Sequence, residues 1–153
     1  LSIKILRRLA KIASDFEIEV AYENLPPGDQ WESGCPLVLV AKIADAIDMN
    51  NVGICVDFSH CFAIGDNVQE NLKKISSSRI IGVHASDGIY ADLKDQHLPP
   101  GQGELDWVDT FQILKSMGFD GNINLEAKGL EGRPNELRTI FELMENAWTK
   151  LNT

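Results

Sequence analysis

Four residues with metal-ligating side chains stand at the ends of four separate apolar segments of the sequence. Each segment ends in a carboxylate or an imidazole, and the segments are Glu17–Glu23, Val52–Asp57, Arg79–His84 and Asn122–Glu126. Carboxylate oxygens and imidazole nitrogens together suit a divalent cation such as Zn²⁺, Mn²⁺, Mg²⁺ or Co²⁺. Strands that run in the same direction bring their carboxyl ends to one edge of the sheet. We therefore predict a divalent-metal site formed by Glu23, Asp57, His84 and Glu126.

Three further residues with ligand chemistry lie close to this set in the sequence. His60 follows Asp57 in a DxxH pair, and Asp95 and His97 form a DxH pair. Asp and His at loop starts often act only as caps or turn formers, so neither pair is specific alone. The joint pattern is more informative, because all three histidines of the chain fall within or next to the metal set.

Glu126 ends an otherwise apolar segment, and this context predicts that its carboxylate is buried. A buried carboxylate without a partner is strongly destabilising, which favours ligation or a strong hydrogen bond there.

The elements that must position these residues alternate along the chain. Apolar residues recur at the helical period in five segments, which are Leu1–Ser14, Pro36–Met49, Asp66–Ile75, Leu105–Met117 and Pro134–Leu151. In the last segment Leu137, Ile140, Phe141, Met144 and Trp148 share one apolar face. Helices that alternate with strands predict an α/β fold with a parallel sheet. Four such β/α repeats are half of a (β/α)8 barrel.

A complete barrel of this type needs about 200 residues or more, and this chain has 153. We therefore expect residues 1–153 to form a single domain, the C-terminal half of a barrel. Half a barrel leaves two open strand edges, which tend to pair with other chains. The missing N-terminal half of a longer polypeptide would close these edges, and a symmetric homodimer is the alternative.

Composition excludes several classes of protein. The net charge of −9 disfavours nucleic acid as a partner. No apolar run approaches the roughly 20 residues that span a membrane, and the mean hydropathy is −0.12. The three cysteines show no CxxC spacing, which favours a reducing, cytoplasmic location.

Two segments outside the strands are candidates for substrate contacts. Ser86–Asp106 contains three glycines and two prolines, and a loop of roughly 20 residues in a small domain usually has a function. We expect its Leu98–Gly103 part to form a lid or wall of the pocket, and Trp107 to pack in the core. Lys128 follows the last strand, where barrels often bind phosphate, so we predict a role in substrate binding.

Five stretches of the chain together resemble the xylose-isomerase-like TIM-barrel superfamily, which includes sugar phosphate isomerases and epimerases as well as endonuclease IV. The resemblance covers most of the chain but only the second half of the family barrel. The stretches are Tyr22–Asn24, Gly53–His60, Gly82–Asp87, Asp95–Trp107 and Asn124–Glu126.

The resemblance implies one of two activities. In the isomerase and epimerase branch, the four predicted ligands hold one divalent metal. Glu23 and Glu126 are then the acid/base pair that moves a proton through an enediolate, His60 contacts a substrate hydroxyl, and the substrate is a sugar or sugar phosphate. In the endonuclease branch, His60, Asp95 and His97 join the quartet as zinc ligands, and the reaction is phosphodiester cleavage at abasic DNA. A third interpretation is a truncated fragment without activity.

Overall fold

A computed structural model describes residues 3–28, 34–75 and 79–150. Its centre is one sheet of four strands in the order of the sequence, and every neighbouring pair is parallel. The strands are β1 (Val20–Glu23), β2 (Val52–Asp57), β3 (Ile80–Ala85) and β4 (Asn122–Leu125). The predicted parallel α/β fold of four β/α repeats is therefore confirmed.

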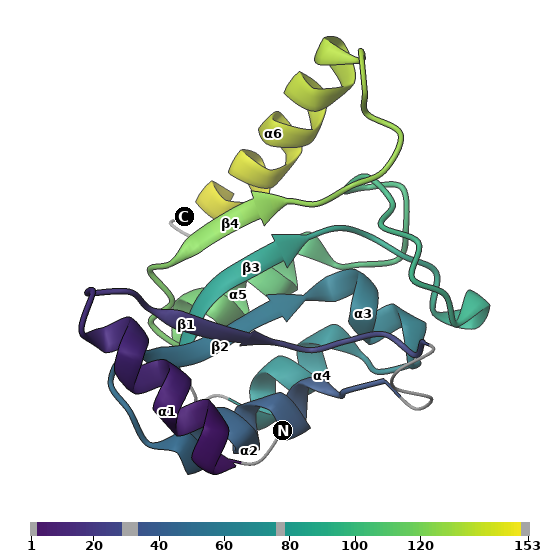
Figure 1. The fold of residues 1–153 in the computed structure, drawn as a ribbon. Helices are drawn as coiled ribbons and strands as arrows, with labels where there is room; N and C mark the ends of the chain where they lie inside the picture. Colours follow the sequence, from purple (N-terminus) through teal and green to yellow (C-terminus); the bar gives the residue numbers. More distant parts are fainter. Residues whose placement is uncertain (1–2, 29–33, 76–78, 151–153) are drawn as a thin grey trace.

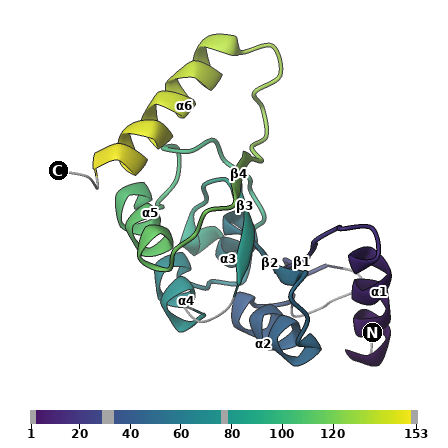
Figure 2. The same ribbon diagram turned by 90° about the vertical axis from the view of Figure 1, so that its left-hand side faces the viewer.

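The helices lie in an arc along the outer side of the sheet, and no helix of the described chain covers its inner side (Figures 1 and 2). The long helices are α1 (Ile3–Ser14), α2 (Leu37–Ile47), α4 (Val68–Lys74), α5 (Trp107–Ser116) and α6 (Pro134–Thr149). A curved parallel sheet with helices on its outer side only is half of a β/α barrel.

The core lies between the sheet and this arc of helices. All six residues of β2 are buried, as expected for a central strand of a parallel sheet. Ile54 and Val56 pack toward α2, α4 and α5 in a cluster that includes Leu37, Leu72 and Phe111. The outermost strand β4 instead alternates between exposed and half-buried residues, because it has no neighbour on its far side among the described residues.

Capping residues explain why the helices begin slightly later than the periodicity predicts. The side chain of Asn67 accepts a hydrogen bond from the Glu70 N–H at the start of α4. Asp106 accepts one from the Asp109 N–H at the start of α5. A capping residue stands outside the helix that it caps, and the predicted starts at residues 66 and 105 each fall two residues early.

Three expectations differ from the structure. The first strand begins at Val20, because Glu17 adopts a left-handed conformation (φ 57°) in the turn that ends α1. A short helix, α3 (Phe58–Ala63), follows β2 directly and is not among the predicted helical segments. Phe141 is 58% exposed, because α6 buries Ile140 and Ala147 instead.

The first helix also presents an apolar surface to solvent. Ile5, Leu9 and Ile12 are 46–57% exposed and follow one another at helical spacing, so they form one stripe. The opposite side of the helix, with Leu6 and Ala10, is buried against the domain. In the described part of the chain, no helix is both long and apolar enough to cross a membrane.

Candidate metal centre

The four predicted ligands meet at the carboxyl edge of the sheet. Glu23, Asp57 and His84 occupy β1, β2 and β3, with Asp57 directly opposite His84 in the register. Glu126 comes directly after β4 and keeps the strand direction through a hydrogen bond from its N–H to the Ala85 carbonyl. One ligand atom from each of these residues lies within 4.8 Å of all the others. We call these four residues the quartet.

His84 is at the centre of the quartet. Its Nδ1 lies 3.0 Å from Glu23 Oε1, 2.8 Å from Glu126 Oε2 and 3.6 Å from Asp57 Oδ2. In the described part of the chain, the ion pairs that the three carboxylates of the quartet form are with histidines only. Three carboxylates thus converge on one imidazole without a Lys or Arg among their partners, and a bound cation would supply the missing positive charge.

Asp57 carries the strongest sign of a missing ligand. Its side chain is fully buried, and its Oδ2 has no hydrogen-bond partner. Burial raises the pKa of this carboxyl above its ordinary value, although the nearby His60 acts in the opposite direction. An unpaired carboxylate oxygen is costly in such a place, and a divalent cation in the quartet would satisfy it. The residues present therefore fit a metal.

A second group of ligand atoms lies beside the quartet. The Nδ1 atoms of His60 and His97 lie 2.7 and 2.9 Å from the backbone carbonyls of Asn24 and Glu126. A carbonyl only accepts, so each Nδ1 carries a proton, and in the neutral form of each ring the Nε2 presents a lone pair. The Nε2 of His97 lies 3.0 Å from Asp95 Oδ1, which is buried and forms no hydrogen bond.

The Nε2 of His60 lies 3.9 Å from the same Asp95 oxygen. Metal-binding histidines commonly donate their second ring N–H to a carbonyl in this way. Asp57, His60 and His97 also form a compact group of candidate ligands by themselves. All seven predicted ligands therefore lie together in the structure.

Asn24 ties the ends of β1 and β2 together, and the sequence did not reveal this role. Its side-chain NH₂ donates to the Asp57 carbonyl at 2.8 Å, and its side-chain oxygen accepts from the Asp57 N–H at 2.9 Å. The backbone carbonyl of Asn24 holds His60, as described above. The only sequence signal was its place directly after a predicted ligand.

Cys55 lies two residues before Asp57 on β2, opposite Glu23 in the register. Burial, and then the negative charges of the neighbouring carboxylates, raise the pKa of this thiol to about 12. In the metal-free protein the thiol therefore stays protonated at neutral pH. The thiolate is the form that binds a metal.

Glu126 and Lys128 are more exposed than a closed site would leave them. The Glu126 side chain is 49% exposed, so the expected burial of this carboxylate is wrong. The reason is that β4 is an edge strand and that no described element covers the inner side of the sheet. Lys128 is also exposed, and its Nζ lies 3.9 Å from Asp95 Oδ2 at the border of the second group.

The segment between β3 and α5 is more ordered than a connecting loop. It contains a 3₁₀ turn (Tyr90–Asp92), and Asp87 and Leu98 bridge it as a short antiparallel pair. These contacts bring Asp95 and His97 back to the quartet. Trp107 packs in the core against Phe58 and Phe111, as predicted.

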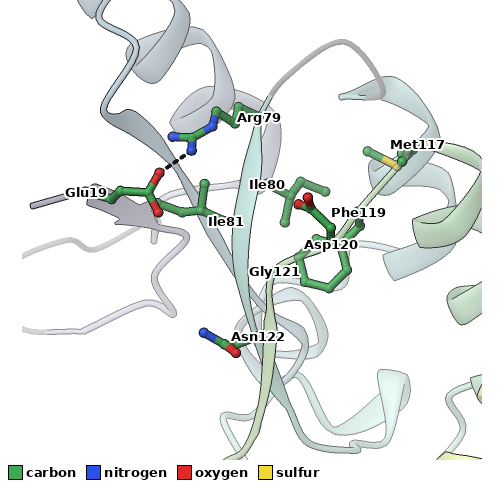
Figure 3. A pocket seen from close by; sticks show the side chains of 10 residues that line it. Glu19, Arg79, Ile80, Ile81, Met117, Phe119, Asp120, Gly121 and Asn122 are labelled. Atoms are coloured by element: carbon green, nitrogen blue, oxygen red, sulfur yellow. Dashed lines mark hydrogen bonds and ion pairs between the residues drawn. The ribbon is translucent and has the colours of Figure 1, made fainter. Parts of the chain in front are cut away.

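A separate pocket of about 460 Å³ lies at the opposite, amino-terminal ends of the strands (Figure 3). Glu19 and Arg79 form an ion pair at its wall, and Gly121 and Asn122 line its other side. None of the seven predicted ligands lines it. Barrel active sites lie at the carboxyl ends of strands, so the candidate site is the ligand cluster and not this pocket.

A half-barrel of parallel β/α repeats with candidate metal ligands at its carboxyl edge defines the class of this protein. The model of the xylose isomerase-like TIM barrel family matches residues 1–147. The chain belongs to this family.

Among known proteins, the chain is 31% identical over 142 residues to the uncharacterized protein MJ1311 of Methanocaldococcus jannaschii, with 92% of this chain and 47% of that protein covered. It is 26% identical over 130 residues to an inosose isomerase of Halalkalibacterium halodurans, with 81% of this chain and 44% of the isomerase covered. The chain thus spans about half the length of the curated relatives it matches.

The chain also matches about half the length of two solved structures. A D-tagatose 3-epimerase-like protein superposes with a TM-score of 0.75 at 28% identity, over 94% of this chain and 54% of that one. The IOLI protein with a bound zinc atom superposes with a TM-score of 0.77 at 24% identity, over 97% of this chain and 55% of that one. The relatives with a functional name include inosose isomerases and a D-tagatose 3-epimerase-like protein, which supports the broad class of isomerases and epimerases for the family.

Proposed function

We propose that the chain supplies the metal-binding half of a sugar or sugar phosphate isomerase or epimerase. The observation that carries this proposal is the convergence of Glu23 and Glu126, from the two outer strands of the sheet, on His84 Nδ1. Two carboxylates on opposite sides of one metal position are the groups that a proton transfer between neighbouring carbons requires. The inosose isomerase and epimerase relatives support the same class.

Glu23, Asp57, His84 and Glu126 would hold the metal, which is Mn²⁺, Co²⁺, Mg²⁺ or Zn²⁺. When bound, such a cation polarises substrate oxygens and stabilises the negative charge that develops on them during proton transfer. The zinc in the IOLI structure is compatible with this ligand set.

The protein side of the reaction falls to the two glutamates. One carboxylate removes a proton from the carbon next to the substrate carbonyl, and the other returns a proton. His60 contacts a substrate hydroxyl through its unprotonated Nε2, and Lys128 lies where a substrate phosphate would meet a positive charge. Which glutamate removes the proton and which returns one decides which face of the sugar is protonated.

Replacing Glu126 with Gln tests this proposal. The variant keeps the size of the side chain but cannot accept a proton, and loss of such a group typically lowers turnover by about 10²- to 10⁴-fold. The assay is turnover of a ketose panel, with circular dichroism to verify folding. Glu131→Gln is the matched control, because Glu131 is exposed on the same connection but outside the quartet. Near-normal turnover in Glu126→Gln would remove this residue from the mechanism.

Turnover requires a completed barrel in this proposal. The open edges β1 and β4, the uncovered inner face and the apolar stripe Ile5–Leu9–Ile12 are the surfaces that a completing half would bury. We propose that an N-terminal half of the same polypeptide covers them, with closure by a second copy as the alternative. Size-exclusion chromatography with light scattering distinguishes the two, because a monodisperse monomer argues against the dimer. Residues 1–153 are then one half-barrel domain, and its cytoplasmic location stays a prediction.

A zinc phosphodiesterase of the endonuclease IV type is the second candidate function. Its support is the second group, in which the Nε2 lone pairs of His60 and His97 approach one oxygen of Asp95. The net charge of −9 weighs against a nucleic-acid substrate. His97→Ala separates the candidates: we expect it to spare ketose turnover but to impair cleavage of an abasic DNA duplex.

Metal content per chain, measured by plasma mass spectrometry after dialysis against a weak chelator, separates the remaining possibilities. About one metal per chain supports the isomerase or epimerase, as expected for one quartet. Two or three zinc ions per chain would favour the phosphodiesterase. No retained metal would support the third interpretation, an inactive fragment.

A further inference from the structure

Asp87 is a buried carboxylate that none of the roles above uses. Its side chain is fully buried and accepts four hydrogen bonds from N–H groups. Oδ1 accepts from the backbone N–H groups of Gly88 and Leu105, each at 3.0 Å. Oδ2 accepts from the Gly101 N–H at 2.9 Å and from the Trp107 indole N–H at 3.1 Å. One carboxylate therefore gathers three separate parts of the segment between β3 and α5.

The backbone of Asp87 fixes a fourth part of the same segment. Its N–H donates to the Leu98 carbonyl at 2.7 Å, and the Leu98 N–H donates back to its carbonyl at 3.0 Å. The fit around the carboxylate is close, because a Cβ at Gly103 would lie 2.3 Å from Asp87 Oδ1. Leu98 directly follows His97, so the pairing of Asp87 with Leu98 fixes the position of the backbone next to His97.

His97 needs such support because its backbone is strained. Its φ of 48° lies in the left-handed region, which residues with a side chain rarely adopt. Its N–H donates to Ser59 Oγ at 2.9 Å, and its carbonyl accepts from the Lys128 N–H at 2.8 Å. Its Nδ1–H donates to the Glu126 carbonyl. These contacts exist only while the segment stays in place.

We propose that Asp87 is a positioning residue, which holds the segment between β3 and α5 so that the His97 ring stays between the Glu126 carbonyl and Asp95. The functional meaning of this role rests on the proposed function, because it matters for a ligand or substrate bound at the quartet. The positioning itself depends only on hydrogen bonds within the described chain. It can therefore be tested without metal and without turnover.

The test is a long-range ¹H–¹⁵N correlation spectrum of the metal-free, ¹⁵N-labelled chain, at a pH above the range in which imidazole titrates. The ring-nitrogen shifts report the partners of each nitrogen, so a ring held between the Glu126 carbonyl and Asp95 differs from a ring released into solvent. In Asp87→Asn the amide must turn its NH₂ toward two of the four N–H donors. We expect the His97 shifts to move to those of a free imidazole, while the shifts of His60, which the Asn24 carbonyl holds, stay unchanged.

Gly103→Ala perturbs the same carboxylate by a different route, since the added methyl displaces Asp87 Oδ1 without removing it. We expect the same change in the His97 shifts. Gly28→Ala is the matched control, because a Cβ there meets nothing within 4 Å, and its His97 shifts should equal those of the wild type. Should Asp87→Asn fail to fold, Gly103→Ala decides the question.

The proposal is overturned if His97 keeps the wild-type nitrogen shifts in a folded Asp87→Asn or Gly103→Ala chain. A fall in melting temperature without a change at His97 would likewise show that Asp87 only stabilises the loop. If the wild type bound no metal or showed no turnover, the proposed function would be refuted. These spectra of the metal-free chain would be unaffected. The two failures are therefore distinguishable.

Discussion

Loading the metal-free chain with Mn²⁺ or Co²⁺ should raise its unfolding temperature, and Asp57→Asn should abolish that rise. The three carboxylates of the quartet place their ligand atoms within 4.8 Å of one another. At that separation each pair of charges repels by about 1–3 kcal/mol, for effective dielectric constants between those of water and a protein surface. The exposure of Glu126 puts its own pairs at the lower end of this range.

A bound cation reverses this repulsion. A metal at 100 times its Kd stabilises the folded state by about 2.7 kcal/mol. For a domain of about 150 residues or more, each kcal/mol raises the unfolding temperature by about 2–4 °C. The expected shift is therefore about 5–10 °C. Asp57→Asn removes one charge from the quartet, so the metal-free variant should melt no lower than the metal-free wild type, yet it should respond little to metal.

Thermal unfolding followed by circular dichroism measures both effects in the same buffer. Asp120→Asn is the matched control, because it removes an exposed carboxylate at the amino-terminal end of the sheet. This control should keep the full response to metal. An equal metal-induced shift in Asp57→Asn and in the wild type would refute the assignment of the site. The absence of any shift with all four candidate metals would do the same.

Two further predictions concern stability. Because the folded-state pKa of Cys55 is raised to about 12, this thiol supports folding below its ordinary pKa of about 8.5, and that support is lost as the pH rises toward the folded value. Urea unfolding at increasing alkaline pH should show a shallower loss of stability in Cys55→Ala, and an unchanged slope would contradict the pKa argument. Phe111 is almost fully buried between Trp107 and Trp148, so Phe111→Ala should lower the free energy of unfolding by about 3–5 kcal/mol. Urea denaturation measures that loss, and a loss below about 1 kcal/mol would mean that this aromatic cluster is not tightly packed.

The quartet could be predicted from sequence because its signal is periodic and local. Each ligand closes an apolar segment, and strands that alternate with helices must run parallel, so their carboxyl ends meet. The order of the repeats therefore predicts that Glu23, Asp57 and His84 are neighbours. The same argument placed Glu126 next to them, although not its exposure, which depends on what lies beyond β4.

The supporting residues could not be predicted, because their partners are distant in sequence or unspecific in type. Asn24 matters only through the register that sets it against Asp57. The carboxylate of Asp87 receives N–H groups from residues up to 20 positions further along the chain, and backbone donors leave no pattern in the sequence. The short helix α3 begins immediately after Asp57, and a strand that passes directly into a helix offers no turn residues to mark the change.

Hydrogen bonds of Asn24, Ser59 and His97 connect different β/α repeats, and they limit how these repeats can be recombined. Each of these residues belongs to one β/α repeat and anchors a residue or segment of another. Repeats are often treated as interchangeable modules that carry their own functional side chain. Here a single repeat transplanted into another barrel would bring its ligand without the neighbour that orients it. Grafting or permutation should therefore move β1 through Lys128 as one block.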